Sequence, residues 1–480
     1  MKGVSFALAL VCVLVMALPL AAMPFLGSST QMENREDAPP PSLTLADGGL
    51  NQQFATDFEN WFLDHFGFRD RLVGWNAWIN LRLLRTSSNE DVIVGRDGML
   101  FFRETVPDYT GSAPLTPGEL AAIRANVRRL ALSIRQRGGN LYIAVAPNKN
   151  TVYPENMPNR YPWRGDGGNP ARLRRALEGT GAIWIELLPA LRDAKKDGQA
   201  YCLTDTHWSG LGARRAAGAI LGAMGGRALP ELQAVGKASH SGDLARMLGL
   251  GDSLVEQLDR YLPGDRDATD YSLHDVACEG RGEGRLLMLR DSFGTAIGPF
   301  ITPAYEGARL RWENPFQATG EADDVLILIA ERNIRLYLGQ PAEAPAPKVE
   351  VAIPAAARRA PCTFEASREG AFACVDFRFG PLQYAGEAYL LIDDAAYWAT
   401  PLSGGQTHEP GWFRALIRPE GFDSDARIRA LCLTGKGRAW VSGDDLALGD
   451  LAEPGAAVEE DDLDDFEDLR RLRQGLIPED

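Results

Sequence analysis

Residues 285–294 read RLLMLRDSFG, an apolar run of strand length that ends in an Asp-Ser pair and a glycine. Similar apolar runs recur as LYIAVAP at 141–147, IWIELL at 183–188 and VLILIA at 325–330. Segments with helical periodicity alternate with these runs; one begins TPGELAAI and precedes the run at 141–147, with Thr116 placed to cap its first turn. Buried strands that alternate with helices are typical of a parallel sheet with helices on both faces. The sequence therefore predicts an α/β fold.

Changes in composition divide the chain into segments. A polar, proline-rich stretch, SSTQMENREDAPPPSL, follows an apolar leader, and a second stretch rich in Pro and Ala begins at Gly339. Between them, GRDGMLFF predicts a hairpin that turns at Asp97-Gly98; beyond Gly339, runs such as FACVDFRFG and WFRALI favour a small β-sandwich. We expect a leader at 1–27, a linker at 28–50, the α/β domain at 51–340, a linker at 341–361, a β-sandwich at 362–445 and an acidic tail at 446–480.

The leader contains an apolar run from Val4 to about Leu26 behind a single lysine. This length is enough to cross a bilayer core, which takes about 20 residues. It also lacks a clear small-x-small cleavage site. We interpret it as a secretory signal or an uncleaved signal-anchor. In both cases the rest of the chain is expected to be exported, either soluble or tethered by this segment.

Export permits disulfides. Outside the leader the chain has five cysteines, an odd number, so at least one stays unpaired, and sequence alone does not dictate the pairing. Our hypothesis is one disulfide between Cys202 and Cys278 and a second among Cys362, Cys374 and Cys432.

The formal net charge of −15 argues against binding nucleic acid through its phosphates. Much of the acidic excess lies in the tail, EEDDLDDFEDLRRLRQ, which has the composition of a solvated appendage, although its apolar residues could form one helical docking stripe. The sequence contains no Cys-x-x-Cys or His-Glu-x-x-His motif, so we predict neither a metal site nor a cofactor.

Residues 204–210 read TDTHWSG and place Asp205 and His207 two positions apart, so that both side chains of an extended segment face the same way. Ser292 follows a predicted strand at the carboxyl edge of the sheet, where α/β proteins bind their ligands. A serine hydroxyl needs a base to become a nucleophile, and an imidazole oriented by a carboxylate supplies one. We therefore predict a catalytic triad of Ser292, His207 and Asp205.

Each motif also has a simpler explanation. Asp205 could cap the helix that begins near Ser209, His207 could be a surface histidine, and an Asp-Ser turn after a strand is ordinary loop chemistry. Asp205 and His207 could also ligate a metal, although no further ligand cluster supports this reading. His240 is a competing candidate for the base.

Acyl transfer also needs hydrogen-bond donors for the developing oxyanion. The backbone N–H of Ser292 is one candidate, and Asn148, which follows the strand LYIAVAP, is another unless it only forms a turn. The cations Lys149, Arg290 and Arg332 lie near the same predicted edge, where they either bind an anionic sugar or remain solvated loop charges.

Four segments together resemble the SGNH-like domain of the alginate O-acetyltransferases of the AlgJ and AlgX type. In chain order they are GRDGMLFF at 95–102, APNKNTVYPE at 146–155, DTHW at 205–208 and RDSFG at 290–294. The resemblance covers about residues 50–340.

This resemblance implies an enzyme that places acetyl groups on exopolysaccharide hydroxyls in the periplasm, with Asp205, His207 and Ser292 as its triad. A membrane-bound O-acyltransferase would supply the acetyl group, and a polysaccharide export complex is a further expected partner. The chain departs from most SGNH esterases in two ways. Its motifs occur in reverse order, as in the alginate family, and Arg290 stands where Gly-Asp-Ser has glycine. The usual glycine oxyanion donor therefore has no counterpart.

The AlgX type carries a carbohydrate-binding β-domain after its catalytic domain, and the β-patterned region near 362–445 resembles it, whereas an uncleaved anchor would fit the AlgJ type. Aromatic side chains there either stack on sugars or form the core, and strand alternation puts Trp412 and Arg414 on one side. The candidates for carbohydrate binding are Trp398, Trp412 and Arg414.

Two other functions fit parts of the same pattern. A carbohydrate acetylesterase would use the same triad and transfer the acetyl group to water. A non-catalytic polysaccharide-binding scaffold of an export complex would not need the triad at all. The sequence favours an exported O-acetyltransferase that works through an acetyl-serine at Ser292.

Overall fold

The computed structural model describes residues 13, 17–18, 21–23, 38–45, 48–229, 234–261, 270–313, 315–316, 322–339, 346, 348–369, 372–380, 387–393, 395–402, 411–417, 422, 425–433, 438–443 and 446–447. All of the expected acidic tail beyond its first two residues, 446–447, lies outside these residues, as does most of the leader. Among the described helices, none is both long and apolar enough to span a membrane.

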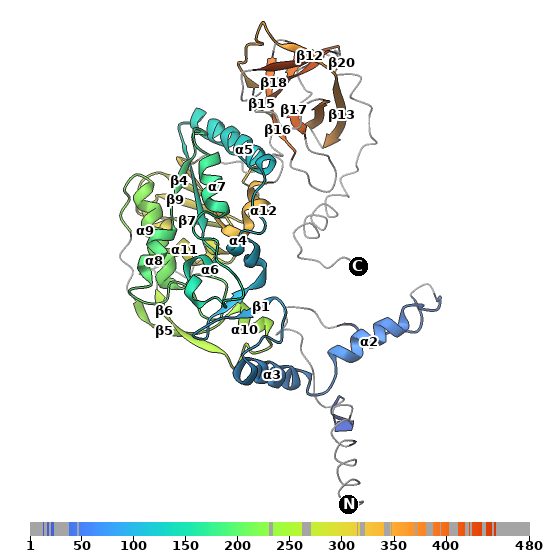
Figure 1. The fold of residues 1–480 in the computed structure, drawn as a ribbon, viewed down its shortest axis with the longest axis vertical. Coiled ribbons are helices and arrows are strands. Elements are labelled where there is room, and N and C mark those ends of the chain that lie inside the picture. The colour runs from blue at the N-terminus through green and yellow to red at the C-terminus, as the bar shows by residue number, and fades with distance from the viewer. Residues whose placement is uncertain are drawn as a thin grey trace, which may run out of the picture. The chain divides into compact units, whose positions relative to one another are not determined.

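The chain divides into two compact units, residues 1–120 with 130–338 and residues 121–129 with 339–480. The first unit contains the predicted α/β fold (Figure 1). Its sheet has six strands, in the spatial order β4 (Ile183–Ile185), β3 (Asn140–Ala146), β10 (Asp324–Ala330), β8 (Arg285–Arg290), β9 (Gly307–Arg311) and β7 (Asp275–Glu279).

All neighbouring strands of this sheet are parallel except β7, which runs antiparallel to β9 at one edge. Because β3, β10 and β8 are parallel neighbours, the residues that follow them lie at the same carboxyl edge. These include Asn148, Glu331 and Ser292. The fold therefore gathers three separate stretches of sequence at one end of the sheet.

Further helices and two antiparallel strand pairs lie outside this sheet, and residues 121–129 of one of these helices belong to the second unit. The helices are α2 (Phe54–Asp64), α3 (Arg69–Ile79), the π-helical η2 (Asn80–Leu84), η3 (Arg103–Thr105), α4 (Val106–Thr110), α5 (Pro117–Gln136), α6 (Lys149–Val152), η4 (Pro154–Asn156), α7 (Asn169–Ala176), α8 (Leu188–Ala194), α9 (Gly210–Ala223), α10 (Asp243–Met247), α11 (Phe293–Ile301), η5 (Thr302–Ala304), η6 (Glu331–Asn333) and α12 (Ile334–Leu338). Two antiparallel pairs join β1 (Val92–Val94) to β2 (Leu100–Phe102) and β5 (Ala234–Ser241) to β6 (Val255–Tyr261).

Local sequence signals explain several of these boundaries. Helix α5 begins with the predicted cap, because Thr116 Oγ1 accepts from Glu119 N at 3.2 Å while Thr116 N donates to the Glu119 carboxylate at 2.7 Å. The β1–β2 hairpin turns at the predicted pair, with φ of 55° at Asp97 and 77° at Gly98. Two positive φ angles in succession fit the turn type that matches the twist of a hairpin.

Both faces of the central strands are buried. Every residue of β10 is buried, including neighbours whose side chains point to opposite faces. On one face, Leu326 and Leu328 belong to a core cluster that also contains Ala217 of α9 and Ile297 of α11. Burial on both faces is why the sequence of this strand is continuously apolar.

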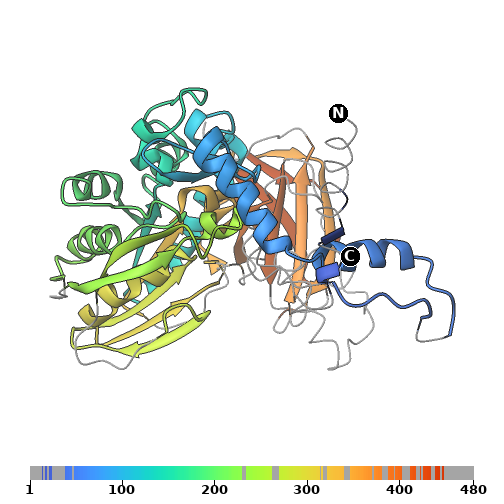
Figure 2. The same cartoon turned by 90° about the horizontal axis from the view of Figure 1, so that it is seen from below.

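The second unit is the predicted small β-domain, sandwich-like and nearly closed (Figure 2). Its continuous path of strands runs β12 (Arg358–Ala360), β19 (Ala439–Ser442), β18 (Arg427–Leu433), β15 (Glu387–Ile392), β16 (Ala395–Pro401), β17 (Trp412–Ile417), β14 (Phe372–Phe379) and β13 (Cys362–Glu369), while β11 (Lys348–Val349) pairs with β16 and β20 (Leu446–Ala447) with β18. Phe377 and Phe413 stack in its core with ring centroids 5.7 Å apart.

Candidate active site

Ser292 lies at the turn between β8 and α11, at the carboxyl edge of the sheet. The buried carboxylate of Asp291 fixes this turn, since its Oδ1 accepts from Phe293 N at 2.9 Å. Its Oδ2 accepts from Ala330 N at 2.6 Å and from Asn333 Nδ2 at 2.7 Å. One carboxylate therefore ties the end of β8 to the end of β10. Sequence reasoning treated this residue only as part of an Asp-Ser turn and missed its role.

His207 and Asp205 reach the same edge from the loop before α9. His207 Nε2 lies 2.8 Å from Ser292 Oγ, and His207 Nδ1 lies 2.7 Å from Asp205 Oδ1. An imidazole held in this way can accept the hydroxyl proton on Nε2 while Nδ1 keeps its proton against the carboxylate. The structure thus brings together the three residues that the sequence selected.

Asp205 does not cap the helix that follows. Helix α9 is capped by Ser209, whose Oγ accepts from Gly212 N at 3.2 Å. The Asp205 carboxylate is therefore available to the imidazole. Phe293 packs beside the His207 ring with a centroid separation of 5.0 Å, which gives the imidazole an apolar neighbour on the α11 side.

His240, the competing base, lies beyond Asp205 rather than at the serine. Its Nε2 is 3.0 Å from Asp205 Oδ2, and Asp243 N donates to the same oxygen at 3.2 Å. Burial by itself raises the pKa of Asp205, but the hydrogen bonds from His207 and His240 outweigh it and hold this pKa well below its usual range. The hydrogen bond to Asp205 also raises the pKa of His240.

A second carboxylate, Asp243, lies close to the imidazole. Its Oδ2 is 3.7 Å from His207 Nδ1, and its Oδ1 accepts from Thr206 N at 2.7 Å. Burial, followed by the negative charge of Asp205, raises the pKa of Asp243. Sequence reasoning did not select this residue, although it belongs to the segment HSGD at 240–243 that supplied His240.

Lys149 holds the loop of Asp205 instead of facing a sugar. Its buried ammonium donates to three backbone carbonyls, Leu203 O at 2.8 Å, Asp205 O at 3.0 Å and Leu100 O at 2.6 Å. Burial lowers the pKa of Lys149 to about 8, so the group is still mainly protonated at neutral pH. An ammonium has three N–H donors, and all three are used here. The expectation of a substrate-binding lysine is therefore corrected to a structural one.

Arg290 is also buried and cannot reach a substrate. Its Nη2 donates to Tyr271 O and to Leu273 O, each at 2.7 Å, and burial lowers its pKa. Arg332 differs, because it is only partly buried and its guanidinium lies 5.4 Å from the centre of the Phe293 ring. Within the described part of the chain it forms no ion pair, so of the three candidate cations it is the one whose side chain is open to a ligand.

Asn148 is fully buried, and its backbone N and its side-chain amide each donate to a carboxylate. Its backbone N donates to Glu331 Oε2 at 2.8 Å, and its Nδ2 lies 3.2 Å from Asp108 Oδ2. Burial, followed by the charge of Asp108, raises the pKa of Glu331 to about 7. Asn148 thus links β3 to the end of β10, and the expected oxyanion role is corrected. The Ser292 backbone N–H has no acceptor among the described residues.

The carbohydrate-binding candidates of the second unit are not presented to a polymer. Trp398 and Trp412 are only 5% and 8% exposed. Arg414 forms a two-point ion pair with Asp376, with both N···O distances at 2.8 Å. These side chains stabilise the β-domain, and we do not retain them as sugar-binding residues.

The expected disulfides are absent among the described cysteines, which is a further correction. Cys202 lies in the loop before α9, where its Sγ is 3.7 Å from Trp208 O. Cys278 lies on the edge strand β7, where its Sγ is 3.7 Å from Ala308 O. The two thiols therefore face different carbonyls on separate elements.

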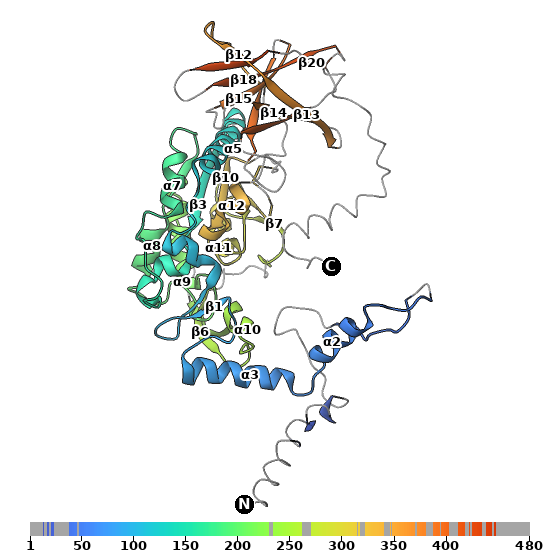
Figure 3. The same cartoon turned by 45° about the vertical axis from the view of Figure 1, so that its right-hand side comes forward.

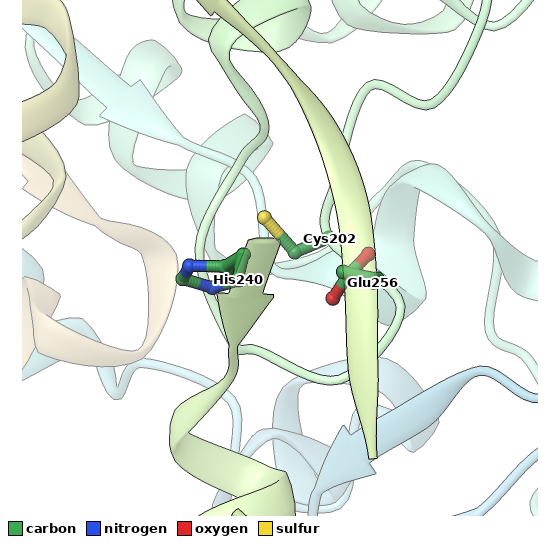
Figure 4. A group of neighbouring side chains, drawn as sticks. All are labelled: Cys202, His240 and Glu256. Atoms are coloured by element: carbon green, nitrogen blue, oxygen red, sulfur yellow. The ribbon is translucent and has the colours of Figure 1, made fainter. Parts of the chain in front are cut away.

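Figure 4 shows Cys202 beside His240 and Glu256, which extend from the paired strands β5 and β6. Two groups of side chains are each close enough together to be considered as metal ligands. One is this group, and the other consists of Asp205, His207 and Asp243. Glu256, however, already accepts from Leu203 N at 2.7 Å and Thr204 N at 2.9 Å. Burial also raises the pKa of the Cys202 thiol, which opposes the thiolate that a metal would need. The cluster of Figure 4 supports the loop through hydrogen bonds.

Comparison with known proteins identifies the relatives of the α/β unit. Residues 92–270 match the family model of the SGNH hydrolase-like domain of the acetyltransferase AlgX. The expected resemblance is confirmed. Asp205 and His207 fall within the matched residues, and Ser292 follows them.

The curated proteins similar to this chain carry the name "probable alginate O-acetylase AlgJ". The protein of Pseudomonas aeruginosa is 32% identical over 218 residues, which are 44% of this chain and 54% of that protein. The protein of Pseudomonas putida is 28% identical over 246 residues, which are 50% of this chain and 60% of that protein. The chain thus spans little more than half the length of these relatives. Among solved structures, the O-acetyltransferase domain of P. putida AlgJ matches with 20% identity and a TM-score of 0.36, over 52% of this chain and 93% of that one.

The contact between His240 and Asp205 predicts a pH-dependent stability. Since the pKa of His240 is higher in the folded protein than in the unfolded chain, the contact contributes fully below about pH 6.5 and is lost as pH rises through the raised pKa. His240→Gln keeps a donor but removes the charge. We expect it to lower the free energy of unfolding more at about pH 5.5 than at about pH 9.

Urea unfolding at both pH values measures this difference. The matched control is the same substitution in an Asp205→Asn background, where the pH dependence of its cost should shrink because only the charge of Glu256 still raises the pKa of His240. An equal cost at both pH values in the native background would contradict the prediction.

Proposed function

We propose that the chain is an exported O-acetyltransferase that transfers acetyl groups to hydroxyls of an alginate-like exopolysaccharide. The observation that carries the proposal is the continuous hydrogen-bonded series from Ser292 Oγ through His207 to Asp205, at 2.8 and 2.7 Å. The names of its relatives, alginate O-acetylases, support the choice of acetyl group and polymer.

In the first half-reaction Ser292 Oγ attacks the carbonyl carbon of the acetyl donor while His207 Nε2 takes the hydroxyl proton. The backbone N–H of Ser292 donates to the oxyanion as negative charge develops on it. The bond to the donor's leaving group then breaks, and His207 returns the proton to that group. Asp205 stabilises the imidazolium throughout. The product is an acetyl ester on Ser292.

In the second half-reaction a sugar hydroxyl attacks this ester. His207 takes the proton of the attacking hydroxyl, and the bond between Ser292 Oγ and the acetyl carbon breaks. The proton then passes to Ser292 Oγ, which restores the starting state. Water in place of the sugar would make the same site a carbohydrate acetylesterase, so the acceptor decides between the two activities.

The remaining parts of the proposal concern location and partners. The apolar run at 4–26 supports export to the periplasm, either soluble or tethered to the inner membrane by this segment. We propose a membrane-bound O-acyltransferase as the source of acetyl groups and a polysaccharide export complex as a further partner. Neither a metal nor a cofactor takes part in the steps above.

Ser292→Ala and His207→Ala should each lower acetyl transfer by about a thousandfold or more, because nucleophile and base act as a unit. The test incubates purified protein with an acetyl-ester donor and oligosaccharides and follows both products by mass spectrometry. Ser272→Ala, an exposed serine outside the site, is the matched control. Acetylated sugar supports a transferase, acetate alone an esterase, and full turnover in Ser292→Ala would overturn both.

Arg332→Gln should weaken the use of an anionic acceptor by about tenfold in KM, or about 1.4 kcal/mol, because it removes a cation near the reacting serine. A neutral oligosaccharide acceptor should be little affected, and kcat should change less than KM. Arg309→Gln, whose guanidinium pairs with Asp275, is the control. Equal changes for anionic and neutral acceptors would contradict a role in binding the polymer's charge.

A further inference from the structure

Helix α3 and the π-helical segment η2 that continues it carry an exposed apolar face. Trp75 is 67% exposed, Trp78 51% and Leu83 69%. Leu72, Ile79 and Leu84 are also exposed. Residues 72, 75, 79 and 83 follow the helical spacing that places side chains along one side. Two exposed tryptophans with several aliphatic neighbours form a patch of the kind that marks an interaction site.

The opposite side of α3 is firmly packed, so the exposed face does not result from a detached helix. Ala77 is buried in a cluster with Val92, Leu244 and Leu248, and Leu81 packs against the same cluster. Figure 3 shows α3 beside β1, β6 and α10 in this unit. The helix therefore has an inner face toward the α/β unit and an outer apolar face toward solvent.

The charges next to this face point to the chemistry of its partner. Arg71, Arg82 and Arg85 are exposed on the same segment, and within the described residues none of them forms an ion pair. They stand out in a chain whose net charge is −15. Tryptophan and aliphatic side chains beside arginines are typical of a helix that lies in a bilayer interface, with rings at the depth of the headgroups and guanidinium groups on phosphates.

We propose that the outer face of α3 and η2 docks on the surface of a bilayer that contains anionic lipids. Negative lipid headgroups attract the nearby arginines, and the apolar side chains enter the boundary with the acyl chains. The sequence supports a lipid partner independently. An apolar run long enough to span a bilayer lies at residues 4–26, and residues 27–68 connect it to α3. This inference does not depend on the proposed enzymatic activity.

Docking would place the candidate active site near the membrane. The inner face of α3 packs on Leu244 of α10, and α10 begins at Asp243. Asp243 in turn accepts a hydrogen bond from Thr206, the neighbour of His207. A helix seated on the bilayer is therefore separated from the reacting imidazole by one short element.

Quenching of tryptophan fluorescence by brominated lipid tests the proposal. The full chain is reconstituted in protein-free vesicles of phosphatidylcholine with phosphatidylglycerol, with or without bromine on the acyl chains. We expect Trp75→Phe with Trp78→Phe to abolish most of the quenched signal, because these rings contact the lipid. Trp163→Phe removes another exposed tryptophan, outside α3, and should leave the quenched signal unchanged. The apolar leader is present in every variant and does not distinguish them.

Charge is tested with Arg71, Arg82 and Arg85 replaced together by Gln, which should reduce quenching and remove its dependence on phosphatidylglycerol. Circular dichroism and the unfolding midpoint verify that the variants fold. Equal quenching in the native chain and in the Trp75/Trp78 variant would overturn the proposal. The proposal would also be overturned if quenching were absent in protein-free vesicles but present in membranes that contain protein. The partner of this face would then be a protein.

Discussion

The buried carboxylate of Asp205 receives hydrogen bonds from both sides, and the arrangement of the site depends on it. One oxygen accepts from the ring and the backbone of His207, and the other accepts from His240 and from the backbone of Asp243. A buried carboxylate with this many donors stays ionised and fixed in orientation. His207 is thereby held with Nε2 toward Ser292, which is the geometry that proton abstraction requires.

The loop that carries Asp205 is itself clamped from two directions. Its carbonyls at Leu203 and Asp205 accept from the ammonium of Lys149, while its N–H groups at Leu203 and Thr204 donate to the carboxylate of Glu256. A loop has no regular ladder to satisfy its buried backbone groups, so side chains must do so. Lys149 and Glu256 thus use their charged groups to hold this loop. Arg290 likewise holds the loop at Tyr271 by donating to its backbone carbonyl.

The sequence predicted what depends on local pattern. Continuous apolar runs located four of the five parallel strands, β3, β4, β8 and β10, but not β9, whose sequence GARLR is not continuously apolar. The strand end and the two-residue spacing selected Ser292, Asp205 and His207, which the structure brings within hydrogen-bond distance of one another. The cap at Thr116 and the turn at Asp97 followed from the same kind of signal.

What depends on tertiary contacts could not be predicted in this way. A lysine or arginine at the end of a strand has the same sequence signal whether its long side chain turns outward or folds inward. Lys149 and Arg290 were therefore expected to bind an anionic sugar or remain solvated, and both proved to be buried. Disulfide pairing and the burial of Trp398 likewise depend on partners far away in the chain. The roles of Asp291 and Asp243 depend on backbone N–H groups, which leave no mark on the sequence.

The most direct measurement of the central claim is the site and rate of labelling by a small sulfonyl fluoride. The serine oxygen displaces fluoride from sulfur, and peptide mass spectrometry locates the adduct without any assumption about donor or polymer. An activated hydroxyl predicts an adduct on Ser292 that forms about a hundredfold or more slowly when His207 is replaced by Gln. An adduct on another residue, or an unchanged rate in the His207→Gln protein, would contradict the account.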